Sequence, residues 1–247
     1  MKKKNRVLLI SQFFWPESFP INPLIKYTKE LNFTIITAKP NYPDGKIYKK
    51  YLKSGVIKEN FNIHKIYHVP VTPRKSGTSL QLFLNYITFL FSSIFFGFKH
   101  LKKEKFDFVL VYNTSPITQI LVGYFFKKVF NVKMGTWVQD IWPESVVATD
   151  HINENFIFNI FRKICHNIYR LNDILFLQSI YFKKYFNKNK IQTKKIYIPN
   201  TSNIQLPKKN LKKSVLKKKF KFNIVYAGNI GMAQHFENFD IFLKKNL

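Results

Sequence analysis

The chain of 247 residues is 46% hydrophobic and 17% aromatic, enough apolar material for a folded core, which excludes a disordered or fibrous protein. Its 41 Lys and Arg outnumber 13 Asp and Glu, and the net charge of +28 favours nucleic acid, an acidic membrane surface or a phosphorylated substrate as partner. A bias towards A/T-rich codons, which encode Lys, Asn, Ile and Phe, is an alternative source of the basicity. Arginine, which guanine recognition prefers, occurs only at Arg6, Arg74, Arg162 and Arg170, and this scarcity argues against base reading.

Apolar runs typical of buried strands alternate along the chain with helical patterns. The predicted strands are residues 6–10, 33–37, 63–71, 107–112, 132–138, 174–177 and 196–198. Predicted helices follow the first strand as far as residue 31 and occupy residues 117–130 and 157–171, and a further helical segment is predicted between residues 177 and 196. This alternation implies right-handed crossovers between parallel strands, so we expect a doubly wound, Rossmann-like α/β sheet. Its ligands would bind at the carboxyl ends of the strands.

A long uncharged segment lies between Lys75 and Lys99. Its length would permit a membrane span of about 20 residues. Five polar side chains interrupt it: Gln81, Asn85, Thr88, Ser92 and Ser93. We therefore expect a helix buried in the domain or lying in the membrane interface, with insertion of residues 79–98 as the less favoured alternative.

The character of the chain changes after residue 198. Between Lys183 and Lys221 there are 14 lysines and no acid. Residues 222–227 then predict a new strand that leads through a glycine-containing turn into a helix ending at residue 247. One strand and one helix cannot bury their own faces. The predicted division is a domain at 1–198, a basic linker at 199–220 and the start of an incomplete second domain at 221–247.

Polar side chains with catalytic potential follow the strand predicted at 132–138. Asp140 and Glu144 are the predicted catalytic residues, because a carboxylate beside an apolar strand is normally avoided unless it binds or catalyses. Asp140 would orient a sugar hydroxyl or accept its proton, and helix capping is the alternative role. Gln139 and Trp142 lie beside it, and the indole is suited to stacking on a sugar ring.

The turn after the strand predicted at 222–227 contains Gly228, Asn229 and Gly231. Its glycines would let backbone amides approach a phosphate at the start of the following helix. A tight strand-to-helix turn without a ligand is an equally weighted alternative.

Other kinds of chemistry find little support in the sequence. Cys165 is the single cysteine, and its neighbours on an apolar helix face predict a buried thiol. The six histidines form no close metal-binding pair, so no metal site is predicted. Neither a Walker lysine loop nor a hydrolase serine elbow is present.

Four motifs occur in a fixed order: SQFFWPE at 11–17, KPNYPDG at 39–45, NTSPIT at 113–118 and QDIWPES at 139–145. Together they resemble the N-terminal domain of GT-B-fold glycosyltransferases of family four, of the WbuB and WcaI type. These transferases build O-antigen, lipopolysaccharide or exopolysaccharide. The sequences IPN at 198–200 and YAGNIG at 226–231 extend the resemblance.

The resemblance implies a retaining transferase, of the hexosyl or deoxy-aminosugar type, that uses a nucleotide-diphospho sugar and needs neither a metal nor another cofactor. The acceptor, a lipid-linked sugar of the undecaprenyl diphosphate type, would bind the N-terminal domain, and the donor would bind the C-terminal domain. Implied acceptor or substrate contacts are Trp15, Glu17, Asn41, Tyr42, Asp44, Asn113, Ser115, Gln139 and Trp142. Gly228, Asn229 and Gly231 would contact the donor phosphates.

The paired glutamates with which this family holds its donor have no counterpart in the chain. We therefore expect a truncated transferase, weak or inactive alone, or half of a split enzyme that needs a separate donor-domain chain. A non-catalytic acceptor-binding remnant is the alternative, and specific nucleic-acid binding is not expected. The predicted location is the cytoplasm, peripheral to the inner face of the cell membrane, because basic and aromatic surface favours anionic lipid.

Overall fold

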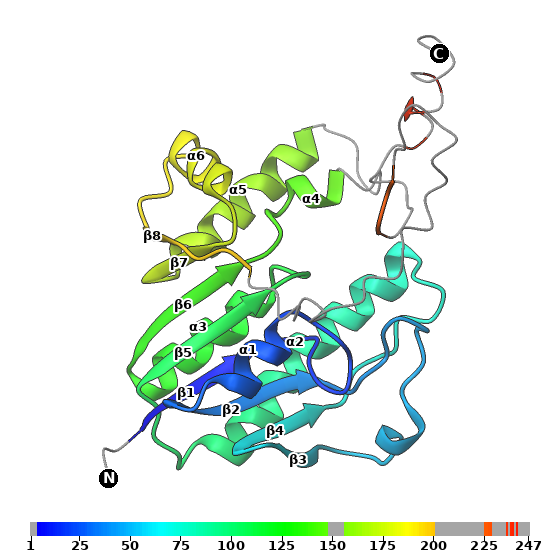
Figure 1. Cartoon of the computed structure of the whole chain (residues 1–247), viewed down its shortest axis with the longest axis vertical. Helices are drawn as coiled ribbons and strands as arrows, with labels where there is room; N and C mark the ends of the chain where they lie inside the picture. Colours follow the sequence, from blue (N-terminus) through cyan, green and yellow to red (C-terminus); the bar gives the residue numbers. More distant parts are fainter. Residues whose placement is uncertain are drawn as a thin grey trace, which may run out of the picture.

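The computed structural model describes residues 4–147, 156–200, 225–228, 236, 238–239 and 241. Its strands are β1 (Asn5–Ile10), β2 (Leu31–Ala38), β3 (Ile57–Phe61), β4 (His64–Val69), β5 (Phe108–Asn113), β6 (Lys133–Val138), β7 (Ile174–Leu177) and β8 (Lys194–Tyr197). They form one eight-stranded sheet in the order β3-β4-β2-β1-β5-β6-β7-β8 (Figure 1). Every neighbouring pair is parallel except β3 with β4.

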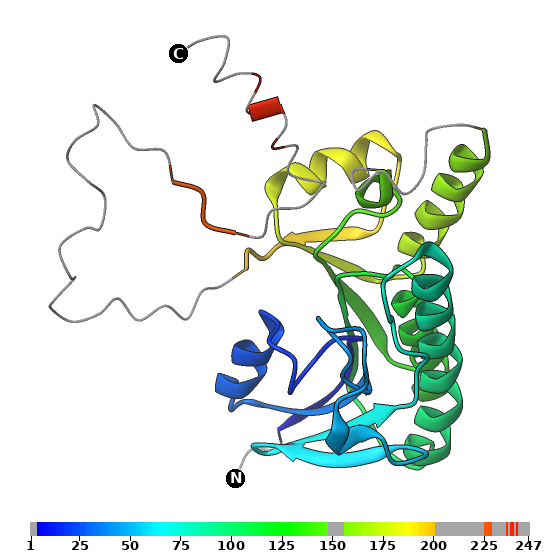
Figure 2. The ribbon, with the colours of Figure 1, turned by 90° about the vertical axis from the view of Figure 1, so that its right-hand side faces the viewer.

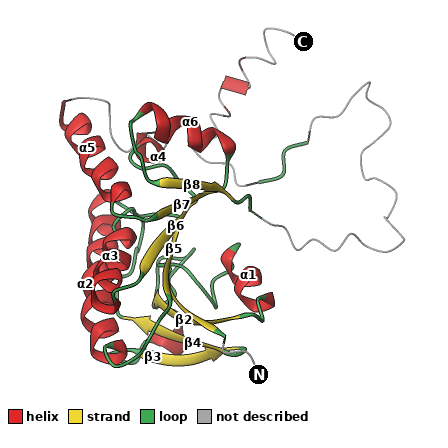
Figure 3. Cartoon of the chain, turned by 90° about the vertical axis from the view of Figure 1, so that its left-hand side faces the viewer, coloured by secondary structure: helices red, strands yellow, loops and turns green. Residues whose placement is uncertain are grey.

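Helices cover both faces of this sheet. They are α1 (Ile21–Tyr27), α2 (Ser79–Leu101), α3 (Gln119–Phe130), α4 (Glu144–Val147), α5 (Phe156–Arg170) and α6 (Ile180–Lys188), with a short 3₁₀ turn at Lys49–Tyr51. Figures 2 and 3 show α1 on one face and α2, α3 and α5 on the other. The predicted doubly wound, Rossmann-like α/β sheet is confirmed.

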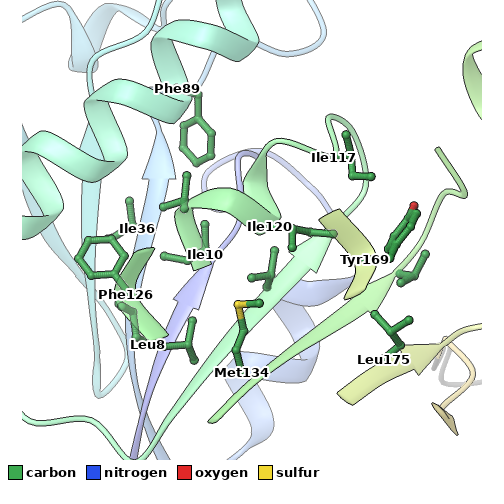
Figure 4. Packing of buried hydrophobic residues seen from close by; sticks show 14 of the residues in the cluster. Leu8, Ile10, Ile36, Phe89, Ile117, Ile120, Phe126, Met134, Tyr169 and Leu175 are labelled. Carbon is green, nitrogen blue, oxygen red and sulfur yellow. The ribbon is translucent and has the colours of Figure 1, made fainter. Parts of the chain in front are cut away.

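The core is built by strands that are buried on both faces. In β1, Val7 and Leu9 pack towards α1, whereas Leu8 and Ile10 belong to the larger cluster under α2 and α3 (Figure 4). This follows from the alternation of side chains along a strand, and it explains why the strands read as continuous apolar runs.

The helix α2 packs on the sheet along one side only. Its buried positions recur every four residues: Asn85, Phe89, Ser93, Gly97 and Leu101. A side chain at Gly97 would place its Cβ 2.7 Å from both Ile36 and Phe126, so glycine lets the helix approach the sheet closely. Among the helices that the structure describes, α2 is long and apolar enough to cross a membrane by length and composition.

Three elements were not predicted. The edge strand β3, with the sequence IKENF, pairs with β4 through a tight turn at Asn62, whose φ is +55°. Its charged residues are typical of a protected sheet edge and conceal the strand pattern. The 3₁₀ turn and α4 are too short to produce a helical period.

The strand predicted at 222–227 is wrong over 225–227, where the chain has no regular structure and Val225 and Tyr226 are exposed. A lone strand has no ladder partner, and none of the described strands pairs with these residues. Residues 201–224 and 229–235, which include most of the linker and the candidates Asn229 and Gly231, lie outside the described residues. The division at 199–220 and 221–247 stays a prediction.

Candidate functional site

The candidate site lies where the order of the strands reverses. From β1 the chain proceeds to β2 and β4 on one side, and it then returns to β5, β6, β7 and β8 on the other side. The carboxyl ends of β1 and β5 are therefore the topological switch point at which parallel sheets bind ligands. Loops 11–20, 39–48, 114–118 and 139–143 all begin at this edge of the sheet.

A buried amide network fixes the base of the first loop. The Gln12 backbone N donates to Gln119 Oε1 at 2.7 Å, and Gln12 Nε2 donates to Asn85 Oδ1 at 2.7 Å. Asn85 Nδ2 donates in turn to the Thr72 carbonyl at 2.6 Å. The network joins the loop to α2 and α3 and explains why a polar residue interrupts the apolar segment at position 85.

Glu17 joins the first loop to the second. Its Oε1 accepts hydrogen bonds from the backbone N of Asn41 and the backbone N of Tyr42, each at 2.7 Å. The side chain is buried, and burial raises its pKa to about 7 although the two amides and Arg74 act to lower it. These contacts give Glu17 a positioning role between the loops. Its contact with a substrate stays a prediction.

An aromatic platform lies above this junction. The ring of Phe13 stacks on Phe19 at 5.1 Å between centroids, and both rings contact Tyr42. The Arg74 guanidinium lies 5.6 Å from the centroids of Phe13 and Tyr42. Arg74 is half-buried and makes no ion pair with any described residue. A guanidinium held in this way can bind an anionic ligand.

The remaining predicted residues of these loops are more exposed. Trp15 contacts Phe61 of β3, with 5.6 Å between ring centroids, and Asp44 is exposed. The turn at Gly45 has φ of +69°, and a Cβ there would lie 1.9 Å from the Lys75 carbonyl oxygen. Glycine is therefore required for the second loop to pass so close to the segment that holds Arg74.

Amide side chains gather at the ends of β5, β6 and β7. Gln139 Oε1 accepts from Asn200 Nδ2 at 2.7 Å, and Gln178 Nε2 donates to the Gln139 carbonyl at 2.7 Å. The side-chain nitrogen of Gln139 and both polar side-chain atoms of Asn113 are buried with no hydrogen-bond partner among the described residues. An unpaired buried amide is unfavourable by about 1–3 kcal/mol, which points to a ligand as its partner.

Asp140 lies beside these amides, directly after β6. Burial raises the pKa of its carboxyl to about 6. The carboxylate has no hydrogen bond or ion pair with any described residue. Burial raises the pKa of Tyr86 on α2 and of Tyr112 on β5, and the charge of Asp140 adds to both rises. A half-buried acid that titrates near neutrality can take a proton from a bound hydroxyl group.

Trp142 closes the same loop. Its indole Nε1 donates to Ser115 Oγ at 3.0 Å, and its ring contacts Tyr86 edge to face at 6.3 Å. The structure thus brings Ser115 and Trp142 together with Tyr86, whose pKa the charge of Asp140 helps to raise after burial. Glu144 has a different partner, because its Oε1 accepts from Arg162 Nε of α5 at 2.9 Å. The catalytic role of Glu144 stays a prediction.

Among the residues of the site that were not predicted are Arg74, Tyr86, Gln178 and Asn200. Tyr86 is hidden in the apolar pattern of α2, Gln178 carries no local signal, and Asn200 belongs to the IPN motif but was given no role. Arg74 could have been found, because it is one of four arginines among 41 basic residues. Of the donor-side candidates only Gly228 is described, and it is exposed. Within the described residues no three His, Cys, Asp or Glu side chains are placed to hold a metal ion.

No protein-family model and no curated protein sequence matches this chain. Solved structures resemble it in fold. Sucrose-phosphate synthase from Thermosynechococcus elongatus is 14% identical, with 81% of this chain and 91% of that chain covered and a TM-score of 0.49. Apo UGT2 from Phytolacca americana is 7% identical, with 82% and 53% covered and a TM-score of 0.51. UGT2 complexed with UDP-2-fluoro-glucose and pterostilbene is 9% identical, with 83% and 56% covered and a TM-score of 0.50.

These neighbours are GT-B glycosyltransferases, and the chain has the Rossmann-like domain fold of that class. It spans about half the length of the UGT2 chain. At such low identities the likeness extends to the fold alone.

Proposed function

We propose that the chain forms the acceptor-side domain of a glycosyltransferase that uses a nucleotide-diphospho sugar in the synthesis of a cell-surface polysaccharide. Asp140 is the observation that supports this most directly, because it is a half-buried carboxylate without a partner among the described residues at the switch point of the sheet. The fold supports the enzyme class, since the Phytolacca neighbour was solved with a UDP-sugar. The resemblance in the motifs at 11–17, 39–45, 113–118 and 139–145 supports the proposed family and the polysaccharide role.

Asp140 would act on the acceptor hydroxyl. The hydroxyl donates a hydrogen bond to the carboxylate, and its oxygen forms the new bond to the anomeric carbon of the donor sugar. The bond from that carbon to the diphosphate breaks, the nucleoside diphosphate leaves with the electron pair, and the hydroxyl proton passes to Asp140. The family resemblance adds that the anomeric configuration is retained, so the hydroxyl would attack from the same face of the sugar that the diphosphate leaves.

Groups beside Asp140 would hold the acceptor. The unpaired amides of Asn113 and Gln139 suit the hydroxyl groups of a sugar, and the ring of Trp142 suits its apolar face. Arg74, held over Phe13 and Tyr42, suits a diphosphate. A sugar carried on a polyprenyl diphosphate has all three features, which supports a lipid-linked acceptor.

The test measures binding and transfer separately on the whole chain. Binding of a short-chain polyprenyl diphospho-sugar is followed by calorimetry, and transfer is followed with radiolabelled nucleotide sugars. Asp140→Asn is expected to reduce transfer by about a hundredfold or more. Glu30→Gln, the same chemical change at an exposed acid of the loop before β2, is expected to have no effect.

Equal transfer by the wild type and Asp140→Asn would contradict the catalytic role of Asp140. Acceptor binding without transfer by the wild type would favour the second candidate, a non-catalytic acceptor-binding module that works with a separate donor-domain chain. Its supporting observation is the set of amide atoms of Asn113 and Gln139 that have no partner among the described residues, because these can hold an acceptor without any chemical step. For this second candidate, transfer is expected to appear when a donor-domain chain is added to the same assay.

A further inference from the structure

The outer side of α2 carries a continuous series of exposed apolar side chains. They are Leu80, Phe83, Leu84, Phe91, Phe95 and Phe98, which recur at helical spacing on the side opposite to the buried one. Phe91 and Phe95 are each 64% exposed. The neighbouring α5, on the same face of the sheet in Figures 2 and 3, exposes Phe156, Ile157, Ile160 and Ile164. Apolar surface of this extent on one face is typical of an interaction site.

The opposite side of α2 is held by the domain. Phe89 is fully buried, Gly97 lies against Ile36 and Phe126, and Asn85 is hydrogen-bonded to Gln12 and Thr72. A helix packed along one side on a sheet cannot be surrounded by lipid. Its outer side alone is available, which is the geometry of a helix lying parallel to a membrane surface.

The charges on this face are of one sign. None of α2, α3 and α5 contains an acidic residue. On the outer side of α2, Phe91, Phe95 and Phe98 line a groove of about 600 Å³ with Phe125 of α3. Lys99 and Lys102 line the same groove. Acids bordering the face are already paired: Glu144 with Arg162, and Asp173 with Lys127.

Aromatic side chains beside lysines that form no ion pair with any described residue complement one partner in particular. In the interface of an anionic bilayer, the rings enter the boundary between headgroups and acyl chains while lysines contact the phosphates. Nucleic acid would match the lysines but would leave the aromatic surface exposed. A second neutral apolar surface would match the rings but not the lysines.

We propose that the outer side of α2, together with Phe125, is the face by which this protein docks on an anionic membrane surface. The N-terminal part of α2 also supplies Asn85 and Tyr86 to the candidate site. The docked face would therefore adjoin the loops that contain Asp140. Delivery of a lipid-linked acceptor to Asp140 rests on the proposed function, whereas docking itself does not.

The test is cosedimentation of the whole chain with vesicles of phosphatidylcholine alone and of equal parts phosphatidylcholine and phosphatidylglycerol. Binding is expected to the anionic vesicles and to weaken at high salt. Phe91→Ser combined with Phe95→Ser is expected to reduce the affinity at least tenfold, and because both side chains are exposed the fold should be unaffected, as circular dichroism would verify. Replacing Lys99 and Lys102 with glutamine is expected to reduce the affinity for anionic vesicles about fivefold per lysine.

Matched controls lie on α1, which covers the other face of the sheet. Tyr27→Ser removes an exposed ring, and Lys26→Gln with Lys29→Gln removes two lysines of that region. None of these changes is expected to alter vesicle binding. Asp140→Asn should bind vesicles like the wild type, so failure of the proposed function would leave this result intact.

Three results would overturn the proposal. One is undiminished vesicle binding by the Phe91→Ser, Phe95→Ser variant, which would assign docking to the lysines of residues 183–221. Another is a wild type that does not bind vesicles but forms a concentration-dependent dimer, together with a monomeric Phe91→Ser, Phe95→Ser variant. That result would make the face an interface between two copies. The third is resistance of the bound protein to extraction at alkaline pH, which would indicate a spanning helix.

Discussion

Two carboxyl groups with raised pKa values mark two differently built parts of the candidate site. Glu17, in the loop after β1, has a pKa of about 7 and binds two backbone amides of the next loop. Asp140, after β6, has a pKa of about 6, and its carboxylate makes no hydrogen bond with any described residue. Burial raises both pKa values, but only Glu17 has protein partners that compensate for the lost water.

The difference gives Glu17 a role in positioning the loops and leaves Asp140 available to react with a substrate. Around Glu17 the loops are joined to one another through Asn41, Tyr42 and the ring of Phe13. Around Asp140, Asn113 has no side-chain hydrogen bond to any described residue and the Gln139 nitrogen has none, whereas Gln12 and Asn22, near Glu17, lack such a partner only for the side-chain oxygen. Uncompensated polar burial lowers stability and is tolerated mainly where a ligand supplies the missing partners. The first part is a scaffold, and the second is the surface on which a substrate would act.

The largest change in stability is expected when the hydrogen bonds of Glu17 are removed. Glu17→Ala leaves the amides of Asn41 and Tyr42 without an acceptor, so the free energy of unfolding should fall by about 3 kcal/mol. Chemical denaturation at pH 5, where Glu17 is protonated, measures this without the contribution of a buried charge. Glu17→Gln keeps the acceptor oxygen and should lose little. Equal losses in the two variants would show that the carboxyl group does not anchor the second loop.

Removing the charge of Asp140 is expected to raise stability. Between its ordinary pKa of 3.8 and its folded pKa of about 6, Asp140 holds a proton in the folded chain that the unfolded chain has lost, so its contribution to stability falls as pH rises. Asp140→Asn should therefore have the same free energy of unfolding as the wild type at pH 3.5. Above pH 6 its free energy of unfolding should be higher by about 2 kcal/mol, which is less than the whole pKa shift would give because the carboxyl group is partly exposed to water.

Asp173 provides a control for that experiment. Although burial acts to raise its pKa, hydrogen bonds from Lys127 and from the backbone N of Met134 lower it overall. Asp173→Asn should therefore lose stability at neutral pH and not at pH values below the folded pKa. Loss of stability by Asp140→Asn at pH 8 would mean that Asp140 has a stabilising partner, and the contrast with Glu17 would fail.

A smaller effect is expected at the unpaired amide of Asn113. Asn113→Leu removes two buried polar atoms without hydrogen-bond partners among the described residues and should raise the free energy of unfolding by about 1 kcal/mol, while weakening ligand binding. Asn172 is the matched control, since its side chain is buried but bonded to Thr136 and to the Tyr169 carbonyl. Asn172→Leu should lower stability. A loss in both variants would indicate that Asn113 is paired in solution.

The fold could be predicted because its determinants are local. Strands buried on both faces produce uninterrupted apolar runs, such as residues 7–10, and the turns between elements contain proline and glycine. The edge strand β3 was not predicted because Lys58 and Asn60 face water and Glu59, which binds Tyr51 and His68, interrupts the apolar side of the strand. The strand expected at 222–227 failed at 225–227 because a strand depends on a partner that a local pattern does not reveal.

The site could be predicted less completely, because its contacts join residues far apart in the chain. The spacing around Asp140 indicated a functional loop, and the structure adds a carboxylate without a partner among the described residues. The hydrogen bonds of Glu17 cross 24 and 25 residues, and Tyr86 meets Trp142 across the top of the sheet. Only assembly of the sheet brings these groups together, and only there do desolvation and charge shift their pKa values.

The smallest effect concerns Arg74, which connects the two parts. Arg74→Met keeps the aliphatic stem but removes the guanidinium from the rings of Phe13 and Tyr42, so the free energy of unfolding should fall by about 0.5–1 kcal/mol. The cation also lowers the pKa of Glu17, which should therefore rise above about 7 in the variant, as carboxyl-selective NMR titration would report. Arg74→Lys keeps the positive charge, so the pKa of Glu17 should rise less in this variant than in Arg74→Met. If Arg74→Met changed neither quantity but abolished binding of a diphosphate, Arg74 would belong with Asp140 in the part open to ligand and not with the scaffold around Glu17.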